Sequence, residues 1–253
     1  MAILDLSART WFDALGLAPQ ERPDALVLEG TWWRERAQAE RLADLTDVRE
    51  TAFPEMFLGR FGAARIAYCC AYGAARAAEP AHVFAQMGTP LLIQIGTCGG
   101  LSARLRAGQV MVPDRVHARD GVAGGYDPAP VLHLAQDWSA AARDGLRRRG
   151  VEPVGGTHLT WTTLFAQSDA LCADWAAEGL ETVDMETATV AAVARRFGAS
   201  AVALLAVWDH LAEGKTFLDP LEPQALAALK AANAATWSTA LDLAAQVADR
   251  RPA

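Results

Sequence analysis

Short apolar runs and segments of helical periodicity alternate along most of the chain. The apolar runs predict strands over residues 24–29, 65–72, 90–96, 109–116, 181–185 and 201–208. The helical patterns predict helices at about 32–43, 77–87, 136–149, 169–178, 187–197 and 222–248, with Pro80 in the first turn of the second helix. Runs as apolar as these are typical of strands buried on both faces of a sheet. The alternation therefore predicts an α/β fold in which helices cover a mainly parallel or mixed sheet.

The size and charge of the chain limit the class of protein. Its 253 residues are 52% hydrophobic, which is enough for one sizeable core. We expect one domain over residues 1–253, with residues 1–22 as an N-terminal extension. The formal net charge of −7 and the lack of clustered Lys and Arg argue against a nucleic-acid-binding surface.

The N-terminal segment and the scattered metal-binding residue types indicate a cytoplasmic protein. The opening MAILDLSARTWFDALG lacks the basic and apolar regions of a signal peptide, and no later run is long enough to span a membrane. The 4 cysteines and 5 histidines show no metal-type spacing. We therefore expect no metal and no membrane partner.

A glycine-rich segment follows the predicted strand over residues 90–96. Gly96-Thr97-Cys98-Gly99-Gly100 predicts a tight turn whose backbone N–H groups and threonine hydroxyl can bind an anion. A plain turn after a strand explains the same residues equally well. The segment is not a Walker A loop, because no Gly-Lys-Ser or Gly-Lys-Thr follows it.

Gly30 and Arg34 form a second candidate anion site. In DALVLEGTWWRERAQAERL a strand leads into Gly30, and Arg34 follows in the first turns of a helix. The planar guanidinium group of arginine suits phosphate oxygens. Taken alone, an exposed helix arginine is the simpler interpretation of Arg34.

Two carboxylates lie beside strongly apolar segments. Asp209 ends the strand in AVALLAVWDHL, at the place where α/β folds bind their ligands, and burial would raise its pKa and suit it to act as a general acid. A helix-capping role for Asp209 is the alternative. Glu186 lies at the entry of an otherwise buried helix in TVDMETATVAAVARRFGA. A carboxylate is tolerated there if it faces a polar ligand rather than the core.

Together these segments resemble the nucleoside phosphorylase family, which includes purine nucleoside phosphorylases, uridine phosphorylases and methylthioadenosine nucleosidases. The resemblance covers residues 23–245 and is carried by TVDMETATVAAVARRFGA and by the triplet Trp208-Asp209-His210. It implies a three-layer α/β/α fold with a central mixed, partly barrel-like sheet. It also implies a homo-oligomeric enzyme that cleaves the N-glycosidic bond of a purine nucleoside by phosphorolysis, giving the free base and a sugar 1-phosphate.

The resemblance implies a phosphate site and an inorganic phosphate co-substrate, with no cofactor. Gly30, Arg34, Gln94 and Thr97 fall where the family binds phosphate, Thr97 also reaches the substrate, and Arg49 resembles an arginine lent by a neighbouring subunit. The family has an arginine where this chain has Gln94, a neutral donor. Losing a charge-assisted contact costs roughly 1.5–3 kcal/mol of anion binding. Hydrolysis by water, as in the nucleosidase branch, is therefore an alternative to phosphorolysis.

The resemblance also assigns the sugar and base positions. Met185 would lie under the ribose, and Glu186 would bind the ribose 2′- and 3′-hydroxyls. Asp209 would protonate or hydrogen-bond N7 of the purine. Phe165 would form an aromatic wall beside the base.

Two tryptophans depart from the family pattern. Trp33 stands in the segment after the first strand, where the family has a compact turn, and Trp208 replaces a small residue beside Asp209. Both indoles are expected to crowd the pocket. They leave open a second class of function, a non-catalytic nucleoside-binding protein that has kept the fold.

Overall fold

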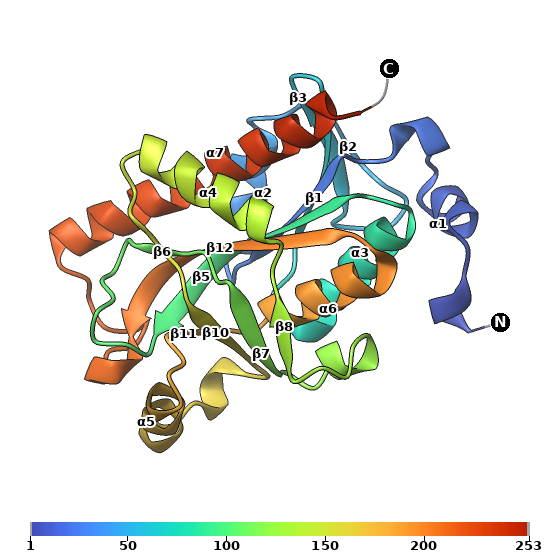
Figure 1. The fold of residues 1–253 in the computed structure, drawn as a ribbon. Coiled ribbons are helices and arrows are strands. Elements are labelled where there is room, and N and C mark those ends of the chain that lie inside the picture. The colour runs from blue at the N-terminus through green and yellow to red at the C-terminus, as the bar shows by residue number, and fades with distance from the viewer. Residues whose placement is uncertain (1, 252–253) are drawn as a thin grey trace.

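A 12-stranded mixed sheet with helices packed around it forms the body of the protein. The computed structural model describes residues 2–251 (Figure 1). The strands are β1 (Ala25–Gly30), β2 (Thr46–Glu50), β3 (Phe57–Phe61), β4 (Ala64–Cys70), β5 (Leu91–Gly100), β6 (Val110–Met111), β7 (Arg115–Arg119), β8 (Val131–His133), β9 (Pro153–Val154), β10 (Thr157–Trp161), β11 (Thr182–Asp184) and β12 (Ser200–His210). The helices are α1 (Ala8–Leu15), α2 (Arg34–Leu42), α3 (Ala74–Gln86), α4 (Gln136–Arg148), α5 (Asp169–Ala177), α6 (Thr187–Phe197) and α7 (Pro223–Asp249). The predicted fold class, α/β with a central mixed sheet, is confirmed.

Strand β5 changes partners along its length. The strand order is β2-β3-β4-β1-β5-β11-β10-β7-β8, and β12 also pairs with β5. The first part of β5 lies between the parallel strands β1 and β12, whereas Gly99 and Gly100 pair antiparallel with β11. Beyond Gly96, β11 takes the place of β1 as the neighbour of β5, so the order of the strands switches at the carboxyl end of β1. Open α/β sheets bind their ligands at such switch points.

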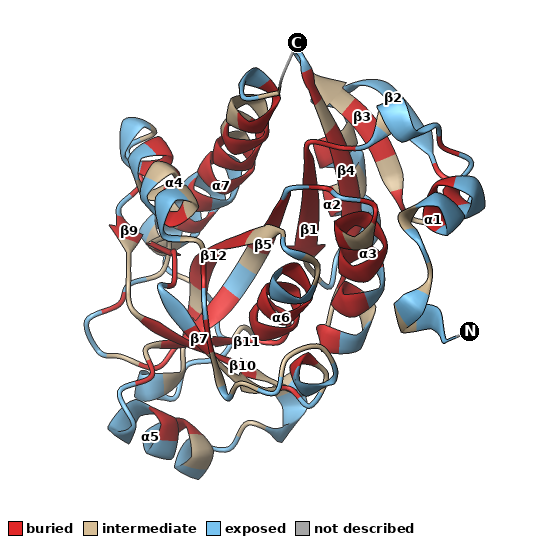
Figure 2. Cartoon of the chain, turned by 45° about the vertical axis from the view of Figure 1, so that its right-hand side comes forward, coloured by how far each residue is buried: buried red, intermediate tan, exposed pale blue. Residues whose placement is uncertain are grey.

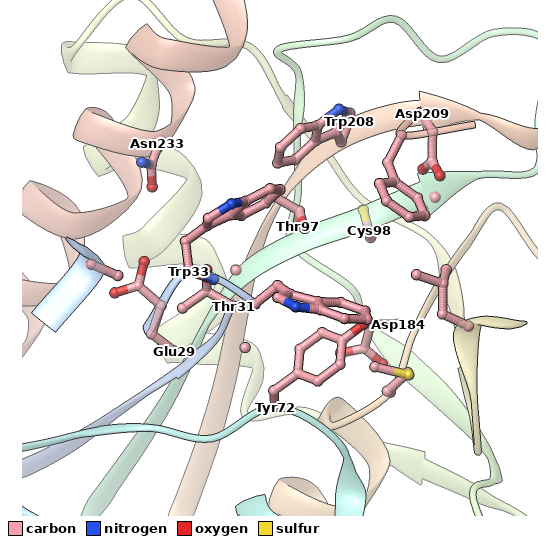
Figure 3. A pocket seen from close by; sticks show the side chains of 18 of the residues that line it. Glu29, Thr31, Trp33, Tyr72, Thr97, Cys98, Asp184, Trp208, Asp209 and Asn233 are labelled. Atoms are coloured by element: carbon pink, nitrogen blue, oxygen red, sulfur yellow. Dashed lines mark hydrogen bonds between the residues drawn. The ribbon is translucent and has the colours of Figure 1, made fainter. Parts of the chain in front are cut away.

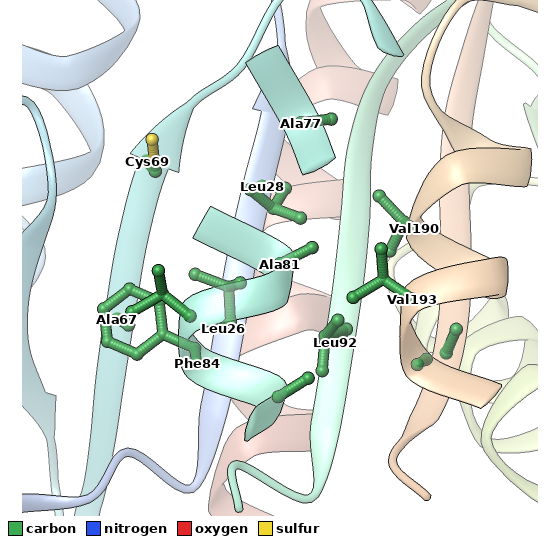
Figure 4. Packing of buried hydrophobic residues seen from close by; sticks show 14 of the residues in the cluster. Leu26, Leu28, Ala67, Cys69, Ala77, Ala81, Phe84, Leu92, Val190 and Val193 are labelled. Atoms are coloured by element: carbon green, nitrogen blue, oxygen red, sulfur yellow. The ribbon is translucent and has the colours of Figure 1, made fainter. Parts of the chain in front are cut away.

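Alternating side chains of the central strands divide the core between the two faces of the sheet. Leu26 and Leu28 of β1 and Leu92 of β5 pack against α3 and α6, as Figure 4 shows. The intervening residues, among them Val27 and Ile93, belong to a second cluster with α4 and α7. Figure 2 shows these central strands buried and the outer faces of the helices exposed. The period-2 alternation of strands therefore produces the three layers.

The prediction of a tight turn at residues 96–100 is wrong. These residues continue β5, which ends at Gly100. Gly96 has φ of +155°, and a Cβ at this position would lie 2.8 Å from the carbonyl oxygen of Gly30. The glycines are needed because the backbones of β1 and β5 approach closely here, and not because the chain reverses.

Pro80 and the strand over residues 109–116 also differ from prediction. Helix α3 begins at Ala74 rather than near residue 77, so Pro80 lies in its interior, where the alanine-rich flanks sustain the helix despite the missing N–H donor. The predicted strand is two strands, β6 and β7, which Pro113 separates because it cannot donate to a ladder.

Several elements carry too weak a pattern to be predicted. All five residues of β2 are exposed, and β10 is rich in threonine and histidine although it is buried.

Helix α7 is the longest, with 27 residues. Within residues 2–251, no helix combines the length and the apolar character needed to cross a membrane.

Candidate active site

A cavity of about 860 Å³ opens at the carboxyl ends of β1, β5, β11 and β12 (Figure 3). Helices α2 and α7 form one side of the cavity, and the loops after β10 and β12 form the other. Glu186 and Asp209 both line it. The fold therefore brings together two carboxylates that are far apart in the sequence.

Glu186 is placed by the start of α6. It occupies the N-cap position but makes no capping hydrogen bond with its own side chain. The preceding Asp184 accepts from the backbone N–H of Thr187 at 3.0 Å and caps the helix instead. The Glu186 carboxylate is therefore free to face the cavity.

The surroundings of Glu186 favour its protonated form. The side chain is 4% exposed and accepts hydrogen bonds from the backbone N–H groups of Gly73 and Met185. Burial and the negative charge of Asp184 raise the pKa of Glu186 to about 8, although the two N–H donors act in the opposite direction. Among the described residues, no cationic side chain forms an ion pair with Glu186.

Asp209 lies near the end of β12 in a pocket made by a glycine. A Cβ at Gly99 would lie 3.1 Å from Asp209 Oδ1, so a larger residue on β5 would displace the carboxylate. Burial raises the pKa of Asp209 to about 6, and backbone N–H donors, including that of Phe217, and the charge of His210 limit the rise. A carboxyl group with this pKa can act as an acid or a hydrogen-bond acceptor near neutral pH.

Gly30 is the meeting point of two other side chains. A Cβ at position 30 would lie 2.9 Å from Glu186 Oε2 and 3.1 Å from Gln94 Nε2. Gln94 is 1% exposed, and its Nε2 donates to the carbonyl oxygen of Ile95 at 3.2 Å. Its Oε1 is buried and has no partner among the described residues. The residue that replaces the family arginine thus lies beside Glu186 and brings no positive charge.

The predicted phosphate-binding arginines lie outside the cavity in the single chain. Arg34 is exposed and pairs with Glu55 at 3.2 Å. Arg49 is exposed on β2 and pairs with Glu21. Gly30 and Thr97 line the cavity, so the structure brings together only the backbone and hydroxyl parts of the predicted phosphate site.

A buried ion pair on the α2 side of the cavity was not predicted. The guanidinium group of Arg41 donates to both oxygens of Glu29, at 2.9 and 3.0 Å, and to Asn233 Oδ1 at 2.6 Å. The hydroxyl of Tyr68 donates to Glu29 at 2.7 Å. The sequence signal for Glu29 was a carboxylate in an apolar strand one residue before Gly30. Because Arg41 is already paired, it is not a free cation for phosphate.

Aromatic side chains surround the mouth of the cavity without filling it. Trp33 and Trp208 stack, as Figure 3 shows, and Trp32 packs edge-on against Phe165 with centroids 5.8 Å apart. Phe165 lines the cavity but is 74% exposed. Trp32 and Tyr72 form an unpredicted aromatic contact at 5.3 Å. Sequence reasoning treated the indoles as possible plugs, and the cavity remains open beside them.

The described part of the chain holds no group of three or more His, Cys, Asp or Glu side chains that could bind a metal ion. The cavity is lined by carboxylates, aromatic rings, the hydroxyls of Thr31, Thr97 and Tyr72, and the cationic side chains of Arg36, Arg41 and Lys230. A mixed sheet of this topology, with carboxylates converging at a switch point, is typical of an α/β protein that binds a small polar ligand at the edge of its sheet.

The chain belongs to the Phosphorylase superfamily, whose family pattern matches residues 26–241. The DeoD-type purine nucleoside phosphorylase of Myxococcus xanthus is 26% identical over 251 residues, which are 94% of this chain and 97% of that protein. The guanosine phosphorylase of Halorubrum lacusprofundi is 29% identical over 147 residues, which span 56% of this chain and 59% of the relative. The predicted family is confirmed, and so is the predicted class of enzyme, since these relatives are named as phosphorylases.

The solved structures support the same fold. The uridine phosphorylase of Vibrio fischeri ES114 superposes with a TM-score of 0.77 and 17% sequence identity, covering 90% of this chain and 94% of that chain. At this identity the likeness concerns the fold alone.

Proposed function

We propose that the protein cleaves the N-glycosidic bond of a purine nucleoside, with phosphate as the acceptor. The observation that carries the proposal is that Glu186 and Asp209, from separate elements, line one cavity at the switch point of the sheet. The choice of a purine is supported by the purine nucleoside and guanosine phosphorylases among the relatives.

The reaction needs a group that holds the sugar and a group that assists the leaving base. Cleavage proceeds through a sugar with positive charge near its anomeric carbon, while negative charge develops on the base. Glu186 binds the ribose hydroxyls, with Met185 under the ring. Asp209 donates to N7 of the purine, and a positioned general acid is worth about 10²–10⁴ in rate. Phe165 forms one wall of the base site.

Phosphate binding in this proposal uses Gly30 and Thr97 first. Arg34 reaches the anion by leaving Glu55, an exposed partner that contributes about 0.2–1 kcal/mol. Arg49 reaches it from a second subunit, which makes the homo-oligomer part of the proposal. Gln94 contributes a neutral donor.

Hydrolysis is the second candidate, and Gln94 is the observation that favours it. The buried amide beside Glu186 supplies no charge to a phosphate dianion. A water molecule that attacks the sugar is neutral, so it needs only a hydrogen-bond acceptor to orient it close to the anomeric carbon. The two reactions share the roles of Glu186 and Asp209 and differ in the acceptor.

The test is incubation of the protein with inosine, guanosine, adenosine, methylthioadenosine and uridine, with and without inorganic phosphate. Phosphate-dependent release of a purine base together with sugar 1-phosphate supports phosphorolysis. Base release that does not depend on phosphate supports hydrolysis. Thermal stabilisation by these nucleosides without any base release would overturn both and would identify a binding protein. Asp209→Asn is the matched control, because it keeps the shape of the side chain and removes its acidic proton.

A further inference from the structure

A chain of buried polar side chains leads to the wall of the cavity that carries Glu186. It runs from Thr182 on β11 through His158 on β10 to Asp184 at the end of β11, and Asp184 itself lines the cavity. We propose that His158 is a positioning residue for Glu186, which acts by holding the carboxylate of Asp184. The effect of His158 on sugar binding rests on the proposed function, whereas the effect of His158 on Glu186 does not.

Asp184 fixes the backbone turn on which Glu186 is mounted. Its carboxylate accepts from the backbone N–H and the hydroxyl of Thr187, and from the hydroxyl of Thr160 at 2.8 Å. The oxygen of Thr160 in turn accepts from the backbone N–H of Ala188 at 2.9 Å. The first free N–H groups of α6 are therefore satisfied from β10 and β11. This arrangement frees the side chain of Glu186 from capping.

His158 compensates a carboxylate that is shut away from water. The imidazole is 0% exposed, its Nδ1 lies 2.7 Å from Thr182 Oγ1, and its Nε2 lies 2.9 Å from Asp184 Oδ1. The Nε2–Oδ1 contact is an ion pair when the imidazole is protonated. Burial would raise the pKa of Asp184, but the charge of His158 and the threonine hydroxyls lower it on balance. Asp184 is therefore held as an anion.

The negative charge of Asp184 changes how readily Glu186 binds a proton. The groups facing Glu186 are the Asp184 carboxylate, the Tyr72 phenol, the Gln94 amide and the backbone N–H groups of Gly73 and Met185. Asp184 is the charged group among them, and its effect is to favour a protonated Glu186. A protonated Glu186 can donate to a sugar oxygen as well as accept from a hydroxyl.

A purely structural role for His158, joining β10 to β11, is the competing interpretation. That role predicts lower stability in a variant but no change in how Glu186 binds its proton. The two interpretations are separated by the contribution of Glu186 to the free energy of unfolding as a function of pH. For the parent and for each variant, this contribution is the free energy of unfolding minus that of the same protein carrying Glu186→Gln in addition. Both free energies are measured by urea unfolding from pH 5 to pH 9.

The sign of this contribution follows from the raised pKa. Since the pKa of Glu186 in the folded protein, about 8, lies above its ordinary value of 4.5, the stabilisation is present at low pH. It is lost as the pH rises from about 4.5 to about 8. We expect Asp184→Asn, which removes the neighbouring anion, to lower the upper limit of this pH range by about one unit or more. We expect His158→Phe, which removes the charge that offsets this anion, to raise the upper limit.

His82→Phe is the matched control, because His82 is also buried and hydrogen-bonded but does not line the cavity. His82→Phe should reduce the free energy of unfolding without changing the pH range over which the contribution of Glu186 is lost. The proposal would be overturned if Glu186 lost its stabilising contribution over the same pH range in Asp184→Asn and His158→Phe as in the parent. Asp184→Asn keeps the volume of the side chain and tests the action of Asp184 on Glu186. If His158→Phe does not fold, His158→Gln, which keeps a polar side chain between β10 and β11, decides the role of His158 in the same measurement.

The second readout is the ratio of kcat/KM for inosine to that for 2′-deoxyinosine. Loss of a well-placed contact between Glu186 and the 2′-hydroxyl should lower this ratio by about 2–10-fold in both variants and leave it unchanged in His82→Phe. An unchanged ratio in both variants would contradict the effect on sugar binding. If the parent itself turns over no nucleoside, the proposed function fails, and the unfolding experiment still decides whether His158 positions Glu186.

Discussion

The indole rings of Trp33 and Trp208 lie almost parallel in the cavity, with centroids 5.4 Å apart and an angle of 15° between their planes. Trp33 precedes α2 and Trp208 belongs to β12, so the stack joins two walls of the site. Figure 3 shows it between Asn233 on α7 and Asp209. The stack narrows the cavity on the side where Gly30 and Thr97 are found, and access of the acceptor should depend on it.

Replacing one indole should therefore open the acceptor side of the cavity. We expect Trp33→Ala to lower the KM for phosphate while reducing stability by about 0.5–1.5 kcal/mol through the lost stacking. Trp138→Ala is the control, because Trp138 contacts Arg250 and does not line the cavity. Steady-state kinetics with varied phosphate make the comparison, and a KM that is unchanged or higher in Trp33→Ala would show that the stack does not restrict the acceptor.

Asp209→Asn should lower kcat/KM for a purine nucleoside by about 10²–10⁴, with little effect on nucleoside binding. The parent should lose activity as the pH rises through about 6, because the acid form of Asp209 disappears above its pKa. The variant should lack this step. Full activity in Asp209→Asn on a confirmed substrate would exclude Asp209 as the acid.

Gln94→Arg should restore a cation beside Glu186 and tighten phosphate binding by about 10–100-fold, the equivalent of roughly 1.5–3 kcal/mol. It should also lower the pKa of Glu186, because a positive charge favours the carboxylate. Gln94→Met controls for size without charge. Isothermal titration with phosphate measures the affinity, and equal affinity in the arginine and methionine variants would refute a role of this position in acceptor binding.

The buried pair of Glu29 and Arg41 should matter for stability. Arg41→Met leaves the Glu29 carboxylate buried without its cation, and we expect a loss of about 3–5 kcal/mol in the free energy of unfolding. The matched control is Arg9→Met, which breaks an exposed pair with Asp13 and should cost less than about 1 kcal/mol. Urea unfolding at neutral pH compares the two, and similar losses in both variants would contradict the prediction.

Local pattern was enough to predict the parts of the fold whose periodicity is strong. Helix α6 was predicted at its observed limits, and α4, α5 and α7 within one residue at each end. The prediction of a turn at residues 96–100 was wrong because glycine was taken as a signal for chain reversal. Gly96 is required instead by the close approach of the backbone of β1. That contact depends on sheet register, which no local window contains.

The candidate site shows the same division between local and distant information. Motif position alone placed Glu186, Asp209, Met185 and Thr97 on the cavity. It did not foresee that Arg34 would turn to Glu55, 21 residues away, or that Asp184 would take over the capping of α6. Both outcomes are rotamer choices among nearby partners, and these choices are fixed only when the whole cavity wall is assembled.

The meeting of Gly30 and Gly96 has a consequence for how such a protein can change. Main chain, rather than side chains, forms the floor of the site there, since any Cβ at residue 96 would collide with the opposite carbonyl group. Point substitutions therefore have little scope to reshape the floor. New substrate preferences would have to arise at the rim, where exposed residues such as Trp32, Phe165 and Leu218 can be exchanged without disturbing the sheet beneath.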